Sequence, residues 1–321
     1  MTNVMTVLGS VDVNDLGFTL MHEHILNTSA GIPHAFPELV NREEAIVRGI
    51  EVMKNAAAEG VKSCVDVTTM DLGRDMIVIR EVAERSEVNI IVCTGIWRDI
   101  PRAIGIGVTP DQLARAFIRD IEVGIENTGV RAGIIKVATD LEHMTDDGLT
   151  PANELVLRAA ARASNHTGVP ISTHTAAQAR AGDRQVEIFQ DEGVPLNRVY
   201  IGHSNDTDNI EYLTGLLGKG CFVGMDRYPG GRNGGLNWEQ RTEVVKQLVD
   251  LGFSGQVTMS HDCVINGLNL PEREVERRAY NPDDISFISR NVLPRLRDLG
   301  VTEEQINSMM VDVPRRVFGG E

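Results

Sequence analysis

Short apolar segments rich in valine and isoleucine recur along the chain at fairly even distances, and most of them are almost continuously hydrophobic. Parallel strands that are buried on both faces of a sheet have this pattern. The pattern therefore predicts eight strands, at residues 18–24, 61–68, 89–95, 132–139, 169–175, 199–204, 221–226 and 256–262.

Between these segments, the spacing of hydrophobic residues is typical of amphipathic helices. Thr109–Pro110 and Thr150–Pro151 predict helix starts, because threonine is a good N-cap and proline suits the first helical position. Gly60 predicts a helix end, since glycine readily adopts the left-handed conformation found after many helices. The predicted helices lie within residues 42–60, 109–129, 150–168, 206–220, 237–252, 281–300 and 302–310.

The alternation of strands and helices, without a low-complexity linker, predicts one domain over residues 1–321. The predicted fold class is α/β, a single (β/α)₈ TIM barrel with a short N-terminal extension. A doubly wound open sheet is the alternative, but that fold would need a glycine-rich phosphate loop after its first strand. The sequence has no such loop there, so we expect the barrel.

Composition and charge narrow the class of partner. The chain has 321 residues, of which 42% are hydrophobic, and its 46 acidic and 31 basic residues give a formal net charge of -15. Such a surface repels nucleic acids and anionic membranes, so we expect neither as a partner. No hydrophobic run is long enough to span a bilayer, and the N-terminal residues lack the pattern of a secretory signal. The four cysteines are far apart in the sequence, which favours reduced thiols and a cytoplasmic location.

Histidine, lysine and aspartate recur on or at the ends of five predicted strands. In a TIM barrel, catalytic residues lie where the strands meet the loops that follow them. The first strand ends in His22 and His24, the fourth carries Lys136, and the fifth, sixth and eighth end in His174, His203 and Asp262. Their equivalent depths make them candidates for one common site.

The pair His22 and His24 is two residues apart on a strand, so both side chains point the same way, while Glu23 points away toward the helix layer. Neutral imidazole is a good ligand for zinc and its neighbours, and a carboxylate can complete the ligand set. A single histidine is usually a hydrogen-bonded structural residue. Four histidines and an aspartate at matching strand ends instead favour a metal site.

The other histidines do not fit this pattern. His34, His143 and His166 fall in loops or at helix ends, and His261 alternates away from Asp262 on its strand. We expect structural or supporting roles for these four residues.

Lys136 allows three interpretations. It could form an ordinary ion pair, or act as a Schiff-base lysine made reactive by desolvation. It could also react with carbon dioxide to form a carbamate, an anionic group with two oxygens that can bridge two metal ions. The four histidines favour the carbamate, because a metal pair needs an anionic bridge and a Schiff-base enzyme does not need four imidazoles.

The motifs HEH, RAGIIKVAT, TGVPISTHTAA, IGHSNDTD and SHD occur in this order along nearly the whole chain. Together they resemble the phosphotriesterase family of the amidohydrolase superfamily, which includes the phosphotriesterase-like lactonases. The resemblance implies that His22, His24 and Asp262 hold a more buried metal ion and that His174 and His203 hold a more exposed one. It also implies that Lys136, as N6-carboxylysine, bridges both ions together with a hydroxide.

The implied cofactors are two divalent metal ions, zinc first, with cobalt, manganese or iron as alternatives. Such a pair lowers the pKa of the water between them and produces a hydroxide nucleophile. The resemblance further implies that Asp262 is the catalytic proton acceptor and that the assembly is a homodimer. For Asp206 we weigh two roles equally, a partner of a metal-ligating histidine and the N-cap of the helix predicted from residue 207.

Three residues in the loops after the strands are candidates for substrate binding. Trp97 follows the third strand, where an aromatic wall next to the metals is expected, and Arg227 and Tyr228 follow the seventh. The DRY triplet that contains them is similar to the lactonases, whereas THTAA and HSNDTD are nearer the phosphotriesterases.

We therefore expect a small-molecule substrate and a hydrolase of lactones and esters that also has phosphotriesterase activity. A dedicated aryl dialkyl phosphotriester hydrolase is the second expectation. A Schiff-base lyase that uses Lys136 and a catalytically silent binding barrel are the remaining alternatives.

Overall fold

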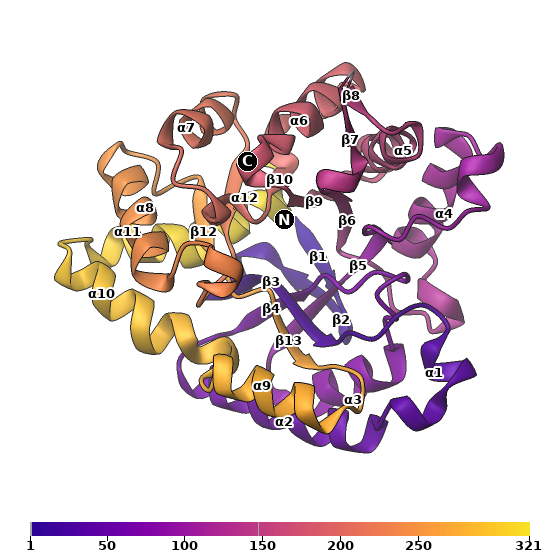
Figure 1. Ribbon diagram of the computed structural model, residues 1–321, viewed down its shortest axis with the longest axis horizontal. Helices are drawn as coiled ribbons and strands as arrows, with labels where there is room; N and C mark the ends of the chain where they lie inside the picture. Colours follow the sequence, from indigo (N-terminus) through magenta and orange to yellow (C-terminus); the bar gives the residue numbers. More distant parts are fainter. Residues whose placement is uncertain (1, 147) are drawn as a thin grey trace.

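Nine parallel strands form one curved sheet at the centre of the computed structural model, which describes residues 2–146 and 148–321 (Figure 1). The order of strands in the sheet is β12-β11-β10-β9-β6-β5-β4-β3-β13. The strands are β3 (Thr19–Leu26), β4 (Ser63–Asp66), β5 (Asn89–Ile96), β6 (Ile134–Thr139), β9 (Ile171–Thr175), β10 (Val199–Ile201), β11 (Phe222–Met225), β12 (Val257–Met259) and β13 (Cys263–Asn266).

The chain around the eighth predicted strand closes the sheet into a barrel. The predicted residues 256–262 contain β12, which pairs with β11, and β13 begins just beyond them at Cys263 and pairs with β3. At the break, the amide of Ser260 donates to the carbonyl of Met225 at 3.3 Å, and the amide of Asp262 donates to the carbonyl of His22 at 3.0 Å. The chain thus passes from one neighbouring strand to the other within a few residues. The predicted barrel is confirmed, with the break in its last strand as an added feature.

Helices surround this barrel (Figure 1). The helices that follow successive strands are α2 (Arg42–Ala58), α3 (Met76–Ser86), α4 (Pro110–Glu122), α5 (Pro151–Thr167), α6 (Ala181–Asp191), α7 (Ile210–Gly218) and α8 (Trp238–Asp250). Helices α3 and α6 were not predicted from the sequence. Both have only 11 residues, and the residue before α6, Arg180, is left-handed and forms no side-chain cap. Neither helix carries the Thr-Pro start that marks α4 and α5.

The two predicted Thr-Pro starts are confirmed. Thr109 accepts a hydrogen bond from the amide of Gln112, whose side chain in turn accepts one from the Thr109 amide. Thr150 caps α5 in a similar way through the amide of Asn153, and Gly168 ends that helix in the left-handed conformation at a φ of 78°. These caps supply partners for amides at helix ends that have none within the helix.

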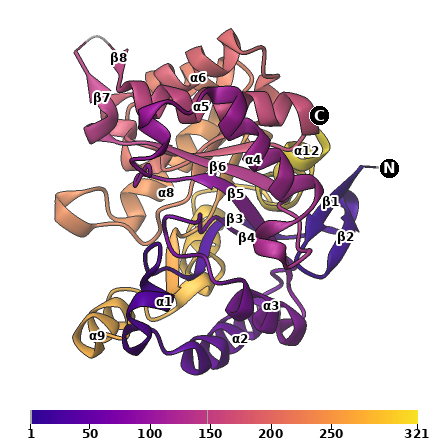
Figure 2. The same ribbon diagram turned by 90° about the vertical axis from the view of Figure 1, so that its right-hand side faces the viewer.

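The N-terminal extension is a hairpin of β1 (Asn3–Thr6) and β2 (Gly9–Asp12). It is bound to the start of β5 by a 2.8 Å hydrogen bond from the amide of Val7 to the carbonyl of Ile90. Figure 2 shows this hairpin at the end of the barrel opposite α9 (Pro271–Tyr280) and the small hairpin of β7 (Met144–Thr145) and β8 (Gly148–Leu149). One end of the barrel is therefore covered, and the C-terminal ends of the strands face the other way.

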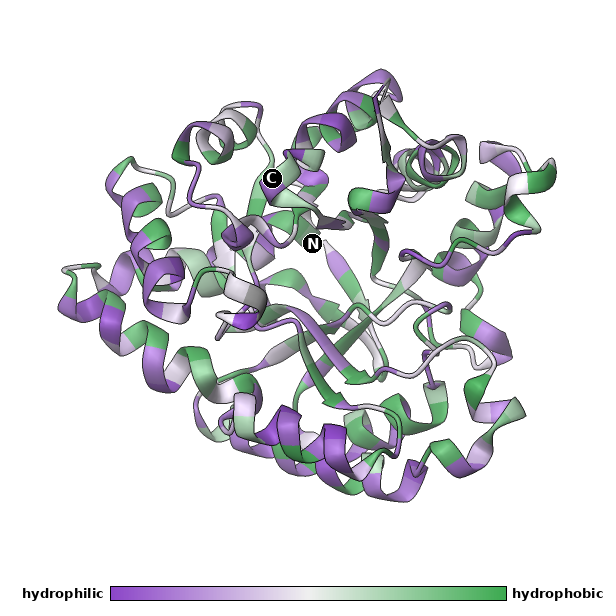
Figure 3. Cartoon of the chain, viewed as in Figure 1, coloured by the Kyte–Doolittle hydropathy of each residue, from purple (hydrophilic) through white to green (hydrophobic). Residues whose placement is uncertain are grey.

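Alternation along the strands separates two groups of buried residues. Ile91 and Cys93 of β5, Ile134 of β6, Tyr200 of β10 and Phe222 of β11 belong to one cluster, and their strand neighbours pack in the larger cluster with the helices. Figure 3 shows hydrophobic residues on the central strands and hydrophilic residues frequently on the surrounding helices. Because side chains alternate along a strand, Lys136, two positions after Ile134, and Asp226, two positions after Gly224, also point into the barrel.

The C-terminal part completes the helical layer with α10 (Leu293–Asp298), α11 (Glu303–Asn307) and α12 (Val313–Gly319). Five-residue π-helical turns precede α10 and α12, and each of these helices has proline at its start. Proline has no amide hydrogen to donate, so a wider turn accommodates it. The short helix α1 (Ile32–Ala35) lies in the loop after β3. In the part of the chain that the structure describes, no helix is long and apolar enough to cross a membrane.

Candidate metal centre

Strand β3 brings two histidines into the barrel. His22 and His24 are 1% and 4% exposed, and both direct Nε2 at the same oxygen, Asp262 Oδ1, at 3.4 and 3.2 Å. The pairing of β3 with β4 shifts register between Leu20 and Glu23, next to His22. From His22 on, the expected alternation holds, and the two rings point the same way as predicted.

Glu23, between these histidines, holds the break in the eighth strand. Its Oε1 accepts hydrogen bonds from Ser260 Oγ at 2.7 Å and from the amide of His261 at 3.0 Å, and its Oε2 accepts one from the amide of Cys263 at 3.0 Å. His261 Nδ1 lies 2.7 Å from Oε1, while its Nε2 accepts from the amide of Ile288 at 3.1 Å. His261 is thus a structural residue, as expected, and Glu23 helps to position Asp262.

Asp262 is at the turn between β12 and β13 and has a positive φ of 52°. In this left-handed conformation the carboxylate of Asp262 points toward the histidines of β3 and toward Arg227. Arg227 Nε lies 3.1 Å from Asp262 Oδ2. Burial alone would raise the pKa of Asp262, but His203, His24, His22 and Arg227 together hold it well below its ordinary value. The carboxylate is therefore ionised and able to act as a metal ligand.

His174 and His203 form a second pair at the ends of β9 and β10. His203 Nε2 and His174 Nδ1 are 2.9 Å apart, and each ring offers its other nitrogen to a carboxylate: His203 Nδ1 to Asp226 at 2.9 Å and His174 Nε2 to Asp140 at 3.0 Å. An ionised carboxylate only accepts, so each of these outer nitrogens carries the hydrogen.

The inner nitrogens of this pair are therefore lone-pair donors in the neutral rings. Burial lowers the pKa of His174 to about 4 and that of His203 well below its ordinary value, so neither ring takes up a further proton near pH 7. Two lone pairs that face each other at 2.9 Å repel unless a cation lies beside them. The chemistry of this donor pair fits a metal ion.

Lys136 of β6 is fully buried, and its Nζ lies 3.2 Å from His22 Nε2. Burial is the largest influence on this amine and lowers its pKa to about 8, despite the opposing effect of Asp226 and Asp262. A larger fraction of the amine is consequently neutral near pH 7 than for an exposed lysine. Neutral amine is the form that reacts with carbon dioxide, because only it has a free electron pair.

Asp226 was missed by the sequence analysis. It is fully buried, and its carboxylate joins both halves of the site, with Oδ1 2.9 Å from His203 Nδ1 and Oδ2 2.9 Å from His22 Nδ1. Tyr200 donates a 2.8 Å hydrogen bond to Oδ2. A Cβ on Gly224 would lie 2.6 Å from the same oxygen, so glycine leaves room for this network. Asp226 ends the seventh predicted strand, and the strand-end rule applied to all eight strands would have identified it.

The ligand geometry can be compared with what zinc requires. Tetrahedral zinc with nitrogen and oxygen ligands at about 2.0–2.1 Å separates the ligand atoms by about 3.3 Å. The separations from Asp262 Oδ1 to the Nε2 atoms of His22 and His24, 3.4 and 3.2 Å, match this value. Metal-ligating histidines also usually donate their other nitrogen to a carboxylate or hydroxyl, and His24 Nδ1 lies 2.8 Å from Thr68 Oγ1. The described residues thus fit a metal centre.

A cavity leads from this cluster to the surface. A small cavity of about 130 Å³ is lined by four of the histidines, Trp97, Arg227 and Asp262, and a neighbouring cavity of about 700 Å³ shares His174, Arg227 and Asp262 with it. Trp97 lies edge-on to His174, with 5.6 Å between ring centres. Trp97 and Arg227 therefore line the space next to the ligand cluster, where the sequence analysis expected substrate.

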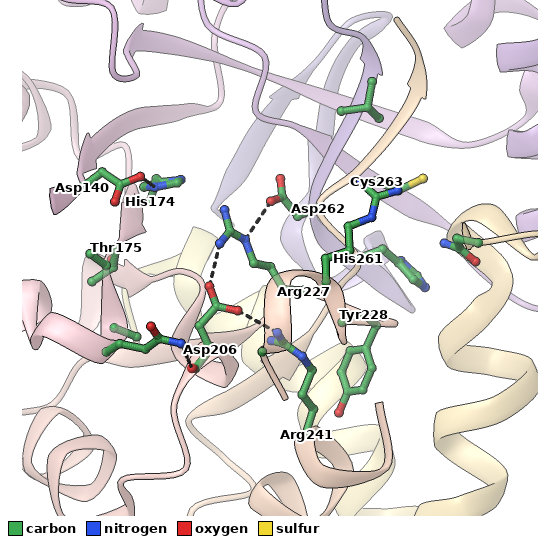
Figure 4. Close-up of a pocket in the computed structure, with 18 of the residues that line it drawn as sticks. Asp140, His174, Thr175, Asp206, Arg227, Tyr228, Arg241, His261, Asp262 and Cys263 are labelled. Atoms are coloured by element: carbon green, nitrogen blue, oxygen red, sulfur yellow. Dashed lines mark hydrogen bonds and ion pairs between the residues drawn. The ribbon is translucent and has the colours of Figure 1, made fainter. Parts of the chain in front are cut away.

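Tyr228 differs from these two residues. It lines the larger cavity, but its side chain is only 2% exposed and packs in the hydrophobic core. In Figure 4 its ring points away from Asp262 and Arg227. A direct contact between this side chain and a substrate stays a prediction.

Neither role predicted for Asp206 is correct. The helix that follows, α7, begins at Ile210 and is capped by Asn209. Asp206 instead pairs with two arginines, with Oδ2 2.6 Å from Arg227 Nη1 and Oδ1 2.8 Å from Arg241 Nη2 (Figure 4). Because Arg227 also contacts Asp262, a chain of alternating charges leads away from the ligand cluster.

Of the remaining histidines, His143 has the supporting role that was expected, and two others lie on the surface. His34 and His166 are exposed, and His166 lies 3.3 Å from Glu122. His143 is buried and its Nδ1 accepts from the amide of Asp140 at 3.1 Å. It thereby supports the segment whose carboxylate contacts His174.

A closed parallel barrel with converging histidines and carboxylates at the C-terminal ends of its strands fits a metal-dependent enzyme of the TIM-barrel type. The model of the phosphotriesterase family matches residues 2–318, and the chain belongs to this family of metal-dependent hydrolases.

Three relatives illustrate the similarity. A Mycobacterium tuberculosis protein named phosphotriesterase homology protein is 40% identical over 327 residues, which cover 99% of this chain and 98% of that protein. An aryldialkylphosphatase of Saccharolobus solfataricus is 36% identical over 319 residues, covering 96% and 97%. A solved structure described as the phosphotriesterase from Mycobacterium tuberculosis superposes with a TM-score of 0.91 at 38% identity, covering 98% of both chains.

Proposed function

We propose that the chain is a binuclear metal-dependent hydrolase of lactones and esters that also has phosphotriesterase activity. The observation that carries the proposal is the convergence of two buried nitrogen pairs, Asp262 and Lys136 at the inner end of a cavity open to solvent. His22, His24 and Asp262 would hold one ion, and His174 and His203 the other. Zinc is the proposed metal, and cobalt, manganese and iron accept the same ligand types.

Lys136 would join the two ions as a carbamate. Its neutral amine would attack the carbon of carbon dioxide, so that an N–C bond forms, one C=O electron pair moves to oxygen, and the nitrogen gives a proton to water. The product would be N6-carboxylysine, an anion whose two oxygens could each serve a metal ion. The burial of Lys136 supports this step, since it favours the neutral amine.

When bound, two divalent ions would supply a hydroxide at neutral pH and would polarise the oxygen of the bond to be cleaved. Asp262 would accept the proton of the nucleophile, because its ionised carboxylate faces the same space as the inner histidine nitrogens. Arg227 orients this carboxylate through the 3.1 Å contact between Nε and Oδ2. Trp97 forms an apolar wall beside His174 and limits how the substrate can lie.

Two observations bear on whether the substrate is a lactone or a phosphotriester. A planar lactone and a tetrahedral phosphotriester both place negative charge on an oxygen within reach of the same site, so overlapping activities are expected. The DRY triplet at residues 226–228 favours lactones. The Saccharolobus solfataricus relative, which is named an aryldialkylphosphatase, favours the second candidate, a dedicated aryl dialkyl phosphotriester hydrolase.

Kinetic comparison of three substrate types tests the proposal. We expect kcat/KM to be higher for acyl-homoserine lactones and an aryl lactone than for an aryl phosphotriester, and the reverse order would support the second candidate. Asp262→Asn should lower kcat by roughly 100-fold or more on every substrate, because the proton acceptor is lost. His166→Gln changes an exposed histidine outside the cavity and should retain activity. Unchanged turnover in Asp262→Asn on lactones and triesters alike would rule out the proposed function.

Two further measurements distinguish the proposed hydrolase from a silent binding barrel and from a Schiff-base lyase. Metal analysis should give two ions per chain, whereas a silent binding barrel would contain none. Activity should be lost on chelation, whereas trapping of Lys136 by borohydride with a carbonyl substrate would support a Schiff-base lyase instead.

A further inference from the structure

The inner charges of the large cavity neutralise one another. Asp206 pairs with Arg227 at 2.6 Å and with Arg241 at 2.8 Å, and Arg227 also contacts Asp262. Arg241 also donates hydrogen bonds to the carbonyls of Asn205 and Leu236, at 2.7 and 2.8 Å. Neither arginine is therefore available to compensate a charge on a substrate.

The outer charges of the cavity are also paired. Asp140 lies 2.8 Å from Arg98 Nη1, and Asp284 lies 2.8 Å from Arg48 Nη2. Arg277 pairs with Glu274 on α9. Of the four arginines that line the cavity, only Arg232 has not yet been assigned an acidic partner.

Arg232 is exposed, and within the described part of the chain its guanidinium has neither a carboxylate within 4.0 Å nor a hydrogen-bond acceptor. Its central carbon lies 3.6 Å from the centre of the Tyr280 ring. A guanidinium that lies over an aromatic face keeps its five N–H groups in its own plane, where its edge is free to donate sideways. This arrangement presents an unused planar donor edge that matches the two oxygens of a carboxylate or sulfonate.

The segment that carries Arg232 is anchored on both sides. Tyr280 of α9 donates a 2.9 Å hydrogen bond to the carbonyl of Gly230, and the amide of Gly231 donates to the carbonyl of Leu236 at 2.8 Å. A Cβ on Gly230 would lie 2.1 Å from Arg241 Nε, so glycine at this position lets the segment pack closely. The backbone that carries Arg232 is thus restrained, so less conformational entropy is lost when an anion binds.

The overall charge increases the need for such a local cation. The chain has a net charge of -15, and an anionic substrate approaching it meets repulsion from the surface as a whole. A cation without an acidic partner in the cavity wall attracts an anionic substrate at that place, against the general repulsion. The same cavity includes Leu141 and Val264, which can contact the apolar part of a substrate.

We propose that Arg232, stacked on Tyr280, binds an anionic oxygen group, a carboxylate or sulfonate, on the part of the substrate remote from the bond that is cleaved. The proposal rests on the proposed function, because it assigns a substrate class, esters and lactones with an acidic side chain, to the same cavity.

A matched pair of substrates tests this assignment. One is a γ-lactone with a side chain that ends in a carboxylate, and the other carries the primary amide of the same side chain. The ratio of kcat/KM, carboxylate over amide, should exceed one in the native enzyme and fall about 10-fold or more in Arg232→Gln, since a charged hydrogen-bonded pair is lost. Arg232→Lys should give an intermediate ratio, because it keeps the charge but not the planar donors.

Controls separate this effect from a general loss of charge or structure. Arg115→Gln removes an exposed arginine of α4, outside the cavity lining, and should leave the ratio unchanged. Tyr280→Leu removes the stacking surface and should lower the ratio as Arg232→Gln does. A ratio in Arg232→Gln equal to that of the native enzyme would overturn the proposal.

Equilibrium binding distinguishes failure of the proposal from failure of the proposed function. If neither lactone is hydrolysed, the proposed function fails. Calorimetric binding of the carboxylate-bearing lactam, which keeps the ring and the side chain, then decides the proposal. Binding about 10-fold weaker in Arg232→Gln supports the anion site, and equal binding refutes it.

Discussion

The carboxylate of Asp226 contacts one histidine from each half of the proposed metal centre. Both contacts are made to the outer ring nitrogens, His22 Nδ1 and His203 Nδ1, each at 2.9 Å. A carboxylate that accepts the hydrogen from an outer nitrogen keeps the lone pair on the inner one, which faces the ion. Asp140 does the same for His174 alone, with a contact of 3.0 Å.

We predict that Asp226→Asn weakens binding of both ions, whereas Asp140→Asn weakens only the ion at His174 and His203. The amide of asparagine offers one accepting oxygen, so the second histidine faces an N–H and is driven to the wrong tautomer. The expected loss of metal affinity is roughly 10- to 100-fold. The measurement is metal content per chain after dialysis against a graded series of chelator concentrations.

Tyr200→Phe is the matched control, since it removes only the hydroxyl that donates to Asp226 and should have a smaller effect. Circular dichroism of each variant shows whether the barrel is folded. If Asp226→Asn keeps two ions at every chelator concentration at which the native enzyme does, the assigned role is wrong.

At the scale of elements, a cluster of ionic contacts joins α5 to the end of α6. Arg162 contacts both oxygens of Glu192, at 2.9 and 3.0 Å, and Arg158 contacts Oε1 at 3.0 Å. The hydrogen bonds from Arg162 are the largest influence on the pKa of Glu192 and lower it from its ordinary value of 4.5. These helices flank β9, which carries His174, so their packing also supports the site.

We predict that Glu192→Gln lowers the free energy of unfolding at pH 7 by about 1 kcal/mol, a modest value because both arginines are partly exposed. A lowered pKa in the folded state means that this contribution is present above pH 4.5 and is lost as the pH falls through the folded value. Urea unfolding of both proteins should therefore show a difference at pH 7 that narrows in acid.

The control is Glu187→Gln, which breaks an exposed pair with Arg184 on the same helix and should change stability little. A difference between Glu192→Gln and the native protein that stays constant down to pH 3 would contradict the assigned cause.

At the scale of the whole molecule, closure of the barrel places polar groups where water cannot reach them. His22, Lys136, His203 and Asp226 are each 1% exposed or less, next to the aliphatic and aromatic residues of the barrel interior. Buried polar groups are costly unless they are paired, and cations would satisfy the inner lone pairs of this cluster. Metal binding should therefore stabilise the whole barrel and not only the loops around the site.

We predict that removal of metal lowers the melting temperature by roughly 6 °C. Ligand at about 1,000 times its Kd adds about 4 kcal/mol, and a chain of 321 residues has an unfolding entropy of roughly 0.7 kcal/mol/K. Differential scanning calorimetry of the chelated enzyme, before and after addition of zinc and bicarbonate, measures this shift. Asp262→Asn should respond less to added zinc, and equal melting temperatures with and without metal in the native enzyme would contradict the prediction.

Much of the site was predictable because the residues that form it follow the period of a strand. His22 and His24 had to share a face, Lys136 lies within β6, and His174 and His203 lie at or just after the strand ends where a barrel carries its chemistry. Helices α4 and α5 were predictable from their Thr-Pro starts. Helices α3 and α6, of 11 residues each, lack that start and were not predicted.

The partners of a charged loop residue were not predictable in the same way. Asp206 has the local sequence of a helix cap, yet its carboxylate pairs with Arg227 and Arg241, 21 and 35 positions further along the chain. Within the described residues, the polar partners of Asp226 are His22, Tyr200 and His203, which lie on or just after other strands. Such pairings depend on how neighbouring strands align.

The sequence by itself determined the barrel and the set of inward-facing ligands, since side-chain alternation and hydrophobic period are local properties of the chain. Only the tertiary structure decided which partners those ligands have. The break between β12 and β13 turns Asp262 onto the histidines of β3, and Arg232 meets Tyr280 across segments about 50 residues apart. Contacts of this kind arise from barrel closure and loop packing, which no short stretch of sequence encodes.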